Sequence, residues 1–354
     1  MTSPLSDSFV DQLNTERQKV DVSVHNFSVR ELVRMMDEGE LNVAPEYQRK
    51  FRWDDNACSL FIESVFLGLP VPPIFVATNV GYQWEVVDGL QRLSSLTYFT
   101  AKDAEQAAAV GKKEPLVLTG IDKLSQLNGT THSDLPRNLQ IYFGRQPLQV
   151  VSLTDKSDLE VRFDVFERLN RGGLTLSAQE VRACVYRGDF NRFIEDLAEN
   201  PSFNGLLKLQ QKAQSDGTKV EEVLKFFAYK NFGDSFDGRV EKFLNKYMLV
   251  ASKTFTYPAE RELFENAARL LYGICGRSPL LRTDSRVRVT PLVMFEACMV
   301  AIAELLSEGS EIVTPKPGWQ DDAELRQSTG AGSNTRAMLE RRMARAKEIF
   351  RGNP

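Results

Sequence analysis

Histidine is scarce in this chain, since His25 and His132 are the only two in 354 residues. Two isolated histidines exclude a histidine-rich nuclease centre and a Ser–His catalytic pair built from this chain alone. No segment fits Gly-x-x-x-x-Gly-Lys-Ser/Thr either, so the P-loop type of nucleotide chemistry is excluded. Two widespread catalytic devices are therefore absent.

Cysteines and long apolar runs are also few. Cys58, Cys184, Cys275 and Cys298 lie far apart, with neither metal-ligand spacing nor a disulfide pattern, so we expect buried, reduced thiols. No apolar run approaches the ~20 residues that a membrane helix needs. Residues 1–19 lack the apolar centre of a secretory signal. These absences predict a cytoplasmic protein that has no membrane partner.

Neither sign of charge dominates, because 44 basic and 48 acidic residues give a formal net charge of −4. That balance argues against a protein whose whole surface is basic and binds polyanions such as DNA. Basic residues are nevertheless concentrated in 277–288 and in the last predicted helix, which carries Arg341, Arg342 and Arg345. A charge-rich terminal helix is most often a solvated face. The alternative is a contact with DNA or with a protein partner.

Length and composition predict a globular protein of about two domains, with 42% hydrophobic and 10% aromatic residues for the cores. We predict an α+β fold: a flexible tail over 1–20, a ParB-like α/β domain over 21–155, and an all-helical domain over 156–354. Hydrophobic periodicity and turn residues predict the elements of each domain, with Ser28 as the cap of the first helix below and Asp54 or Asp55 as the cap of the second. Strands are expected over 74–77, 83–87, 139–143 and 148–153. Helices are expected over 28–37, 54–66, 90–101, 181–186, 190–198, 220–232, 238–250, 260–271, 291–307 and 335–350, with loops over 104–137 and 308–334.

One motif, Asp88-Gly89-Leu90-Gln91-Arg92, lies where a predicted strand runs into a predicted helix. We expect Asp88 to cap the helix and Gly89 to relax the turn. The first helical amides and Arg92 would then face an anion, because unpaired amides and the positive helix end attract negative charge. The alternative is an ordinary capped turn in which Arg92 pairs with a surface carboxylate.

Three further segments belong with this motif. In the first, Gln48 and Arg49 precede Trp53, which could grip a nucleotide or simply anchor the core. In the second, which follows the helix end at Gly68, prolines predict an extended backbone over 69–73, and this favours an architectural role. In the third, Asn-Arg-Gly-Gly ends a helix at 170–173 and a capping box starts the next helix at 177–180. Its functional alternative directs Arg168, Asn170 and Arg182 toward phosphates.

Taken together and in this order, the segments resemble the N-terminal domain of the GmrSD-type restriction proteins, a ParB-like family. The shared pattern is an extended Gln-Arg followed by Trp, a Gly-Leu-Pro-x-Pro-Pro strand entry and an Asp-Gly-x-Gln-Arg turn. A Phe-x-Arg-Leu-Asn-x-Gly-Gly helix end before Glu-x-Arg completes it. The resemblance covers about residues 25–190.

The resemblance implies a domain that binds and hydrolyses a nucleoside triphosphate (NTP) in a bacterial system acting against foreign or modified DNA. By position it implies that Asp88 handles Mg²⁺ or water, and that Gln91 and Arg92 contact phosphate as catalytic partners of Asp88. Mg²⁺ would bridge Asp88 and the triphosphate, and arginines would neutralise the developing charge. The implied nucleotide contacts are Gln48, Arg49, Trp53, Gly89, Arg168, Asn170 and Arg182.

Two departures limit what the resemblance implies. Leu90 stands where family members often have glutamine, which predicts weak turnover. Full restriction proteins of the family also carry a histidine-based nuclease half, which has no counterpart here, so we expect a separate nuclease subunit. A second interpretation is a nucleotide-gated DNA-binding or regulatory subunit that does not hydrolyse NTP. Direct ParB-like endonuclease action has little support, because no acidic cluster for two metals is evident.

Overall fold

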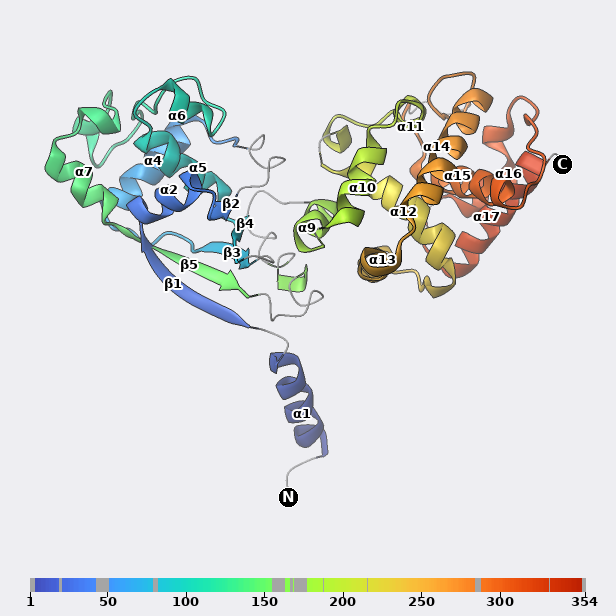
Figure 1. Cartoon of the computed structure of the whole chain (residues 1–354), viewed down its shortest axis with the longest axis horizontal. Coiled ribbons are helices and arrows are strands. Elements are labelled where there is room, and N and C mark those ends of the chain that lie inside the picture. Colours follow the sequence, from blue (N-terminus) through green and yellow to red (C-terminus); the bar gives the residue numbers. More distant parts are fainter. Residues whose placement is uncertain are drawn as a thin grey trace. The chain divides into compact units, whose positions relative to one another are not determined.

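The structure is a computed structural model that divides into two compact units, Met1–Gly172 and Gly173–Pro354. The fold class is confirmed: a mixed α/β unit with a five-stranded sheet is followed by a largely helical unit (Figure 1). Each unit is described by itself below. The structure describes residues 4–18, 21–42, 51–78, 82–154, 163–165, 168, 177–186, 188–214, 216–283, 288–330 and 332–351.

The first unit is built on a mixed five-stranded sheet in the order β1-β5-β3-β4-β2. Strand β5 pairs antiparallel with β1 and parallel with β3. Strand β4 pairs antiparallel with β3 and parallel with β2. The strands are β1 (Val22–Ser28), β2 (Leu41–Asn42), β3 (Ile74–Thr78), β4 (Trp84–Asp88) and β5 (Pro147–Leu153).

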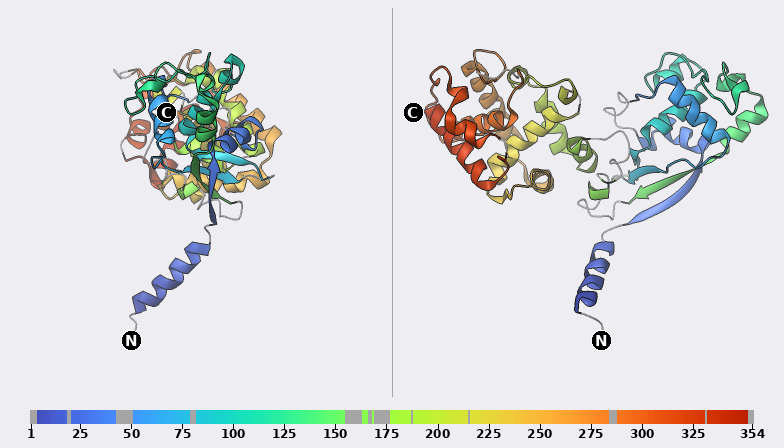
Figure 2. Two further views of the ribbon diagram at one scale, coloured as in Figure 1. Left: turned by 90° about the vertical axis from the view of Figure 1, so that its left-hand side faces the viewer. Right: turned by 180° about the vertical axis from the view of Figure 1, so that it is seen from behind.

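Helices α2 (Val29–Asp37), α4 (Asp55–Phe66) and α5 (Leu90–Thr100) cover one face of this sheet (Figures 1 and 2). Their apolar sides form the core with the strands, because burying that surface is the main force that holds such layers together. The fully buried residues of this core include Leu32, Ile62, Leu93, Leu96, Phe99, Val76 and Val150.

The predicted start signals of two helices are confirmed. The Ser28 hydroxyl accepts a hydrogen bond from the Glu31 amide at the start of α2, and the Asp54 carboxylate accepts one from the Ala57 amide at the start of α4. Each cap satisfies an amide that has no partner within the helix. The start of the chain, predicted as a tail, is helical over Pro4–Gln18 (α1).

Two local predictions are wrong. Residues 139–143, expected as a strand, belong to helix α7 (Arg137–Gly144). A short apolar run does not separate strand from helix by periodicity, and here Phe143 is buried while the Tyr142 hydroxyl donates to the Phe66 carbonyl at 3.1 Å. Asp88 does not cap α5, because it ends β4 and Gly89 occupies the N-cap without a side-chain cap.

The loop expected over 104–137 contains helix α6 (Ala104–Ala108) and the 3₁₀ turns η1 (Ser125–Leu127) and η2 (His132–Asp134). The loop expected over 308–334 contains η5 (Trp319–Asp321) and α16 (Ala323–Ser328). These elements are too short to show a hydrophobic period. The remainder of both stretches that the structure describes is irregular, as predicted.

The second unit is helical, and α15 lies at its centre with a buried side chain at most positions from Met294 to Leu305. The capping box predicted at Ser177 and Glu180 is confirmed, and it starts the first helix of this unit, α9. Its elements are α9 (Ala178–Val185), α10 (Asp189–Ala198), α11 (Pro201–Leu206), η3 (Lys212–Gln214), α12 (Thr218–Phe232), η4 (Gly233–Ser235), α13 (Val240–Thr254), α14 (Tyr257–Ile274), α15 (Leu292–Ser307), η5, α16 and α17 (Arg336–Arg351).

Two further observations extend over the described part of the chain. None of its helices is long and apolar enough to cross a membrane. Its free cysteines include Cys58 and Cys298, both buried as predicted, and Cys275, which is partly exposed. Burial raises the pKa of each of these thiols, so they are unreactive at neutral pH.

The core of the second unit contains a cluster of charges. Lys225 Nζ lies 2.8 Å from Glu222 Oε1, 3.2 Å from Glu221 Oε1 and 3.3 Å from Glu296 Oε1. The Glu222 side chain is completely buried, and burial raises its pKa to about 8, with the Lys225 charge opposing that rise and the Glu296 charge adding to it. Burial therefore favours the protonated form of this carboxyl more than the Lys225 charge favours the ionised form.

This carboxyl predicts an unusual pH dependence. Because the pKa of Glu222 rises from 4.5 to about 8 on folding, the unfolded chain loses this proton first. We expect the Glu222 contribution to stability to be complete below pH ~4.5 and to fall toward pH ~8, at up to about 1.4 kcal/mol per pH unit. Urea unfolding from pH 5 to 8 should show this loss, and Glu222→Gln should remove it. Glu262→Gln, at an exposed glutamate of the same unit, should leave it unchanged.

Candidate functional site

The Asp88–Arg92 motif forms a tight turn between β4 and α5. Gly89 has φ 105° and ψ 8°, a left-handed conformation that favours glycine. A Cβ atom at this position would lie 3.0 Å from Ile74 Cγ1 on β3 and 3.3 Å from Arg92 Nη2. The glycine therefore lets the turn approach both the neighbouring strand and the arginine that follows it.

Asp88 and Arg92 form an ion pair across the turn, with 2.7 Å between Oδ2 and Nη2. The Arg92 side chain is 11% exposed, whereas the Asp88 side chain is 42% exposed. Arg92 Nη2 also donates to the carbonyl of Pro73 at 3.3 Å, so the proline-rich segment contacts the motif. Arg92 Nε is buried and has no hydrogen-bond partner in the described residues.

Gln91 connects the motif to the segment that contains Trp53. Its Oε1 accepts hydrogen bonds from the backbone amides of Arg52 at 3.0 Å and Trp53 at 3.1 Å. Trp53 is partly buried and packs edge-on against Phe61, with 5.9 Å between ring centroids. Direct contacts thus join three of the four sequence segments: the motif, the segment with Trp53 and the proline-rich segment. The side-chain carbonyl of Gln91 positions the backbone at Arg52 and Trp53.

The other predicted nucleotide contacts are not brought to the motif by any described interaction. Gln48, Arg49 and Asn170 lie outside the described residues, and Arg168 is exposed. Arg182 belongs to the second unit, where it is 1% exposed. It donates from Nε to Gln179 Oε1 at 2.9 Å and forms an ion pair with Glu221.

The three predicted DNA-contacting arginines differ in exposure. Arg341 Nε lies 2.9 Å from Glu324 Oε1 and its side chain is 41% exposed. Arg345 Nη2 lies 2.8 Å from Asp322 Oδ2 and its side chain is 18% exposed. Arg342 is fully buried and donates to the carbonyl of Ser333 at 2.8 Å, so its guanidinium faces the interior of the unit.

Sequence reasoning missed one cation near the motif segments. Lys112 Nζ lies 5.0 Å from the ring centroid of Phe51 and 4.9 Å from that of Tyr98, within the range of cation–π attraction. It also lies 3.4 Å from Asp55 Oδ1. Lys112 comes from the irregular stretch after α6, whose pattern gives no signal for this contact.

A metal held by protein side chains alone is not indicated, because no group of three or more His, Cys, Asp or Glu lies close enough together in the described residues. Magnesium is commonly held by one or two carboxylates with substrate phosphates and water as the other ligands. The half-exposed Asp88 carboxylate fits such an ion delivered with a nucleotide.

The turn geometry gives a direct prediction for Gly89→Ala. The strained φ and the close approach to Ile74 should lower the free energy of unfolding by about 1–3 kcal/mol, seen as a lower Tm of the first unit. Gly111→Ala is the matched control, since Gly111 also has positive φ, 75°, but a Cβ atom there would meet no other atom within 4 Å. Equal losses in the two variants would show that the contact with Ile74 is unimportant.

Comparison with known proteins agrees with the placement of the motifs. Residues 29–187 match a family model described as GmrSD restriction endonuclease, N-terminal domain. This range contains all four sequence segments, and the domain family predicted from them is confirmed for residues 29–187. No curated protein and no solved structure matches the chain.

Proposed function

Residues 29–187 belong to the GmrSD restriction endonuclease N-terminal domain family, and from this premise we propose that the chain binds and hydrolyses an NTP at the Asp88–Arg92 turn. It would do so as one component of a bacterial restriction or antiviral defence system that acts on foreign or modified DNA. The observation that carries the proposal is the meeting of three motif segments around Arg92 and Gln91.

Each residue of the turn has a role in this proposal. The first amides of α5 bind a phosphate, since they have no acceptor within the helix. Arg92, held by its contact with Pro73, stabilises negative charge that develops on the transferred phosphoryl group. Asp88, now paired with Arg92, would hold a Mg²⁺ ion delivered with the nucleotide, and the ion would supply positive charge against the phosphates. Gln91 holds the backbone at 52–53, and with it Trp53, beside the nucleotide.

The remaining family positions complete the proposed site. Gln48 and Arg49 come shortly before Arg52 in the sequence, and the Arg52 amide donates to Gln91. Arg168 and Asn170 would close the site over the phosphates. Arg182 is bound within the second unit, where it would join α9 to α12.

A second candidate function is nucleotide binding without hydrolysis. It is favoured by Leu90, which provides no polar group where family members often have glutamine. It is also favoured by the ion pair of Asp88 with Arg92, which must open before Asp88 can bind a metal. In this case the chain would be a nucleotide-gated regulatory subunit.

We further propose that the exposed side of α17 contacts DNA or a nuclease subunit through Arg341 and Arg345. Both arginines pair with carboxylates of the same unit, so a polyanion would have to displace those partners. Binding should therefore be weak and fall steeply with salt. A nuclease subunit would supply DNA cleavage.

The test is phosphate release by the full chain with each of the four NTPs and Mg²⁺, with and without duplex DNA. Release that requires Mg²⁺ and favours one base supports the NTPase proposal. Nucleotide binding without release supports the regulatory alternative. An absence of both binding and release would contradict both candidates.

A further inference from the structure

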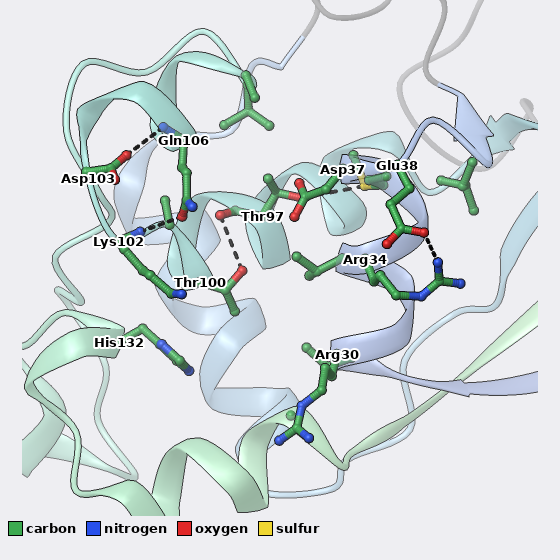
Figure 3. A pocket seen from close by; sticks show the side chains of 18 of the residues that line it. Arg30, Arg34, Asp37, Glu38, Thr97, Thr100, Lys102, Asp103, Gln106 and His132 are labelled. Atoms are coloured by element: carbon green, nitrogen blue, oxygen red, sulfur yellow. Dashed lines mark hydrogen bonds and ion pairs between the residues drawn. The ribbon is translucent and has the colours of Figure 1, made fainter.

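The first unit contains a large open cavity that is separate from the Asp88–Arg92 turn. It has a volume of about 920 Å³ and lies between α2, the end of α5, α6 and α7 (Figure 3). Ligand pockets typically have volumes of about 300–1,000 Å³. The motif occupies the first turn of α5 and the cavity its last turn, and an 11-residue helix is about 16.5 Å long. A single small ligand bound at the motif would therefore not fill the cavity.

One side of the cavity is cationic. Arg30 from α2, Lys102 from the segment after α5, and His132 from η2 point into it (Figure 3), and Arg137 at the start of α7 also lines it. In the part of the chain that the structure describes, neither Arg30 nor Lys102 forms a side-chain ion pair. Arg34, by contrast, is neutralised by Glu31, Glu38 and Glu40. Asp103 and Glu105 also line the cavity, but neither forms an ion pair with Arg30 or Lys102 in the described residues.

His132 is a titratable group on this cationic side of the cavity. Its ring packs edge-on against Phe99, with 5.4 Å between centroids. Burial lowers the pKa of His132, and the charges of Lys102 and Arg137 lower it further. Asp134, the nearest carboxylate in sequence, is bound to the amide and hydroxyl of Thr131. An anion that enters beside the imidazole would raise its pKa, because a nearby negative charge favours the protonated form.

The cavity also has an acidic side. Asp37 lies at the end of α2 near Thr97 (Figure 3), and burial together with the Glu38 charge raises the pKa of Asp37. Its carboxylate makes no hydrogen bond or ion pair in the described residues. Apolar side chains of Val33, Met36 and Val110 line the same cavity. A ligand that suits this lining carries an anion at one end and hydrogen-bond donors on a flat apolar ring at the other.

We propose that this cavity is a second ligand site, which binds a nucleoside monophosphate with its phosphate between Lys102, His132 and Arg30 and its base toward Asp37. Base amino groups donate to the Asp37 carboxylate, and the phosphate accepts from the three basic side chains. The site differs from the proposed NTP site in position and in ligand, because it requires neither Mg²⁺ nor Asp88. An occupied cavity would join α2, α6 and the end of α5 through one small molecule.

The scarcity of histidine provides a sharp test. In full-length protein labelled with ¹³C in the histidine ring, NMR should show two imidazole signals, which His132→Gln assigns. His25 is the internal control, because it lies on β1 with its ring 5.5 Å from that of Trp84. Titration with each nucleoside monophosphate should shift the His132 signal and raise its pKa, while the His25 signal stays unchanged. Inorganic phosphate should do the same only at higher concentration.

Three variants complete the test. Lys102→Gln should weaken monophosphate binding by about 10-fold or more and leave phosphate release from NTP unchanged. Asp37→Asn should reduce the preference for a monophosphate over inorganic phosphate. Arg92→Ala should retain the His132 response, which separates this inference from the NTPase proposal. An unmoved His132 signal at millimolar monophosphate would overturn the inference, and so would a response that Lys102→Gln leaves intact.

Discussion

Replacing Arg92 by alanine should lower the rate of NTP hydrolysis by about 100- to 1,000-fold, the usual cost of removing one donor that stabilises charge in a transition state. The Arg92 guanidinium is 11% exposed and is fixed by Asp88 and Pro73, so little entropy is lost when it binds a phosphoryl oxygen. Because Arg92 lies on the first turn of α5 and outside the apolar core, the variant should still unfold cooperatively. Phosphate release under saturating NTP and Mg²⁺ measures the effect.

The control variant removes another arginine–aspartate ion pair, which lies in the second unit. Arg239 is 66% exposed and pairs with Asp237, two residues away, in the second unit. Arg239→Ala should therefore leave phosphate release unchanged. Arg92→Lys should recover part of the lost rate, because it restores the charge but not the two-pronged geometry of a guanidinium. An Arg92→Ala protein that turns over as fast as the original would exclude Arg92 from the reaction.

Replacing Lys225 by methionine should lower the free energy of unfolding by about 3–5 kcal/mol, because removing one partner of a buried charge cluster leaves the others uncompensated. Lys225 lies within 3.3 Å of three carboxylates, from Glu221, Glu222 and Glu296. Methionine keeps the length of the side chain, so the loss reports charge and not a cavity. Urea unfolding at pH 7 measures this loss.

The control for this effect lies on the same helix. Lys230 is 15% exposed, close to the 13% of Lys225, but it pairs with a single glutamate, Glu260, at 2.9 Å. Lys230→Met should therefore cost clearly less. Similar losses in the two variants would mean that methionine disturbs α12 itself and that the three carboxylates do not need Lys225.

The sequence predicts those parts of the fold that depend on local chemistry. Ser28, Asp54 and Ser177 cap helices as expected, because a short polar side chain before an apolar stripe acts within one turn. The prediction of a strand over 139–143 is wrong, because a run of only five residues fits the helical period and the strand period equally well. The helical placement of 137–144 depends on burial of Phe143, which is a tertiary effect.

The candidate site, too, has features that the sequence predicts and features that it does not. The motif and its glycine turn can be found from spacing, because the chemistry lies within five consecutive residues. The contacts of Arg92 with Pro73 and of Gln91 with the backbone at 52–53 join distant segments, and no periodicity encodes them. The cavity and the Lys225 cluster escape sequence reasoning for the same reason, since each gathers charged residues that look like ordinary solvated surface in sequence.

The strand order has a consequence for synthesis of the protein. Strand β5 is the last of the five to leave the ribosome, yet it lies between β1 and β3. Val22 of β1 pairs with Leu153 of β5, so β1 and β3 each keep an edge open in the nascent chain until β5 emerges. Open edges invite pairing with other chains. Fragments that end before residue 147 should therefore aggregate, whereas chains released after β5 can close the sheet.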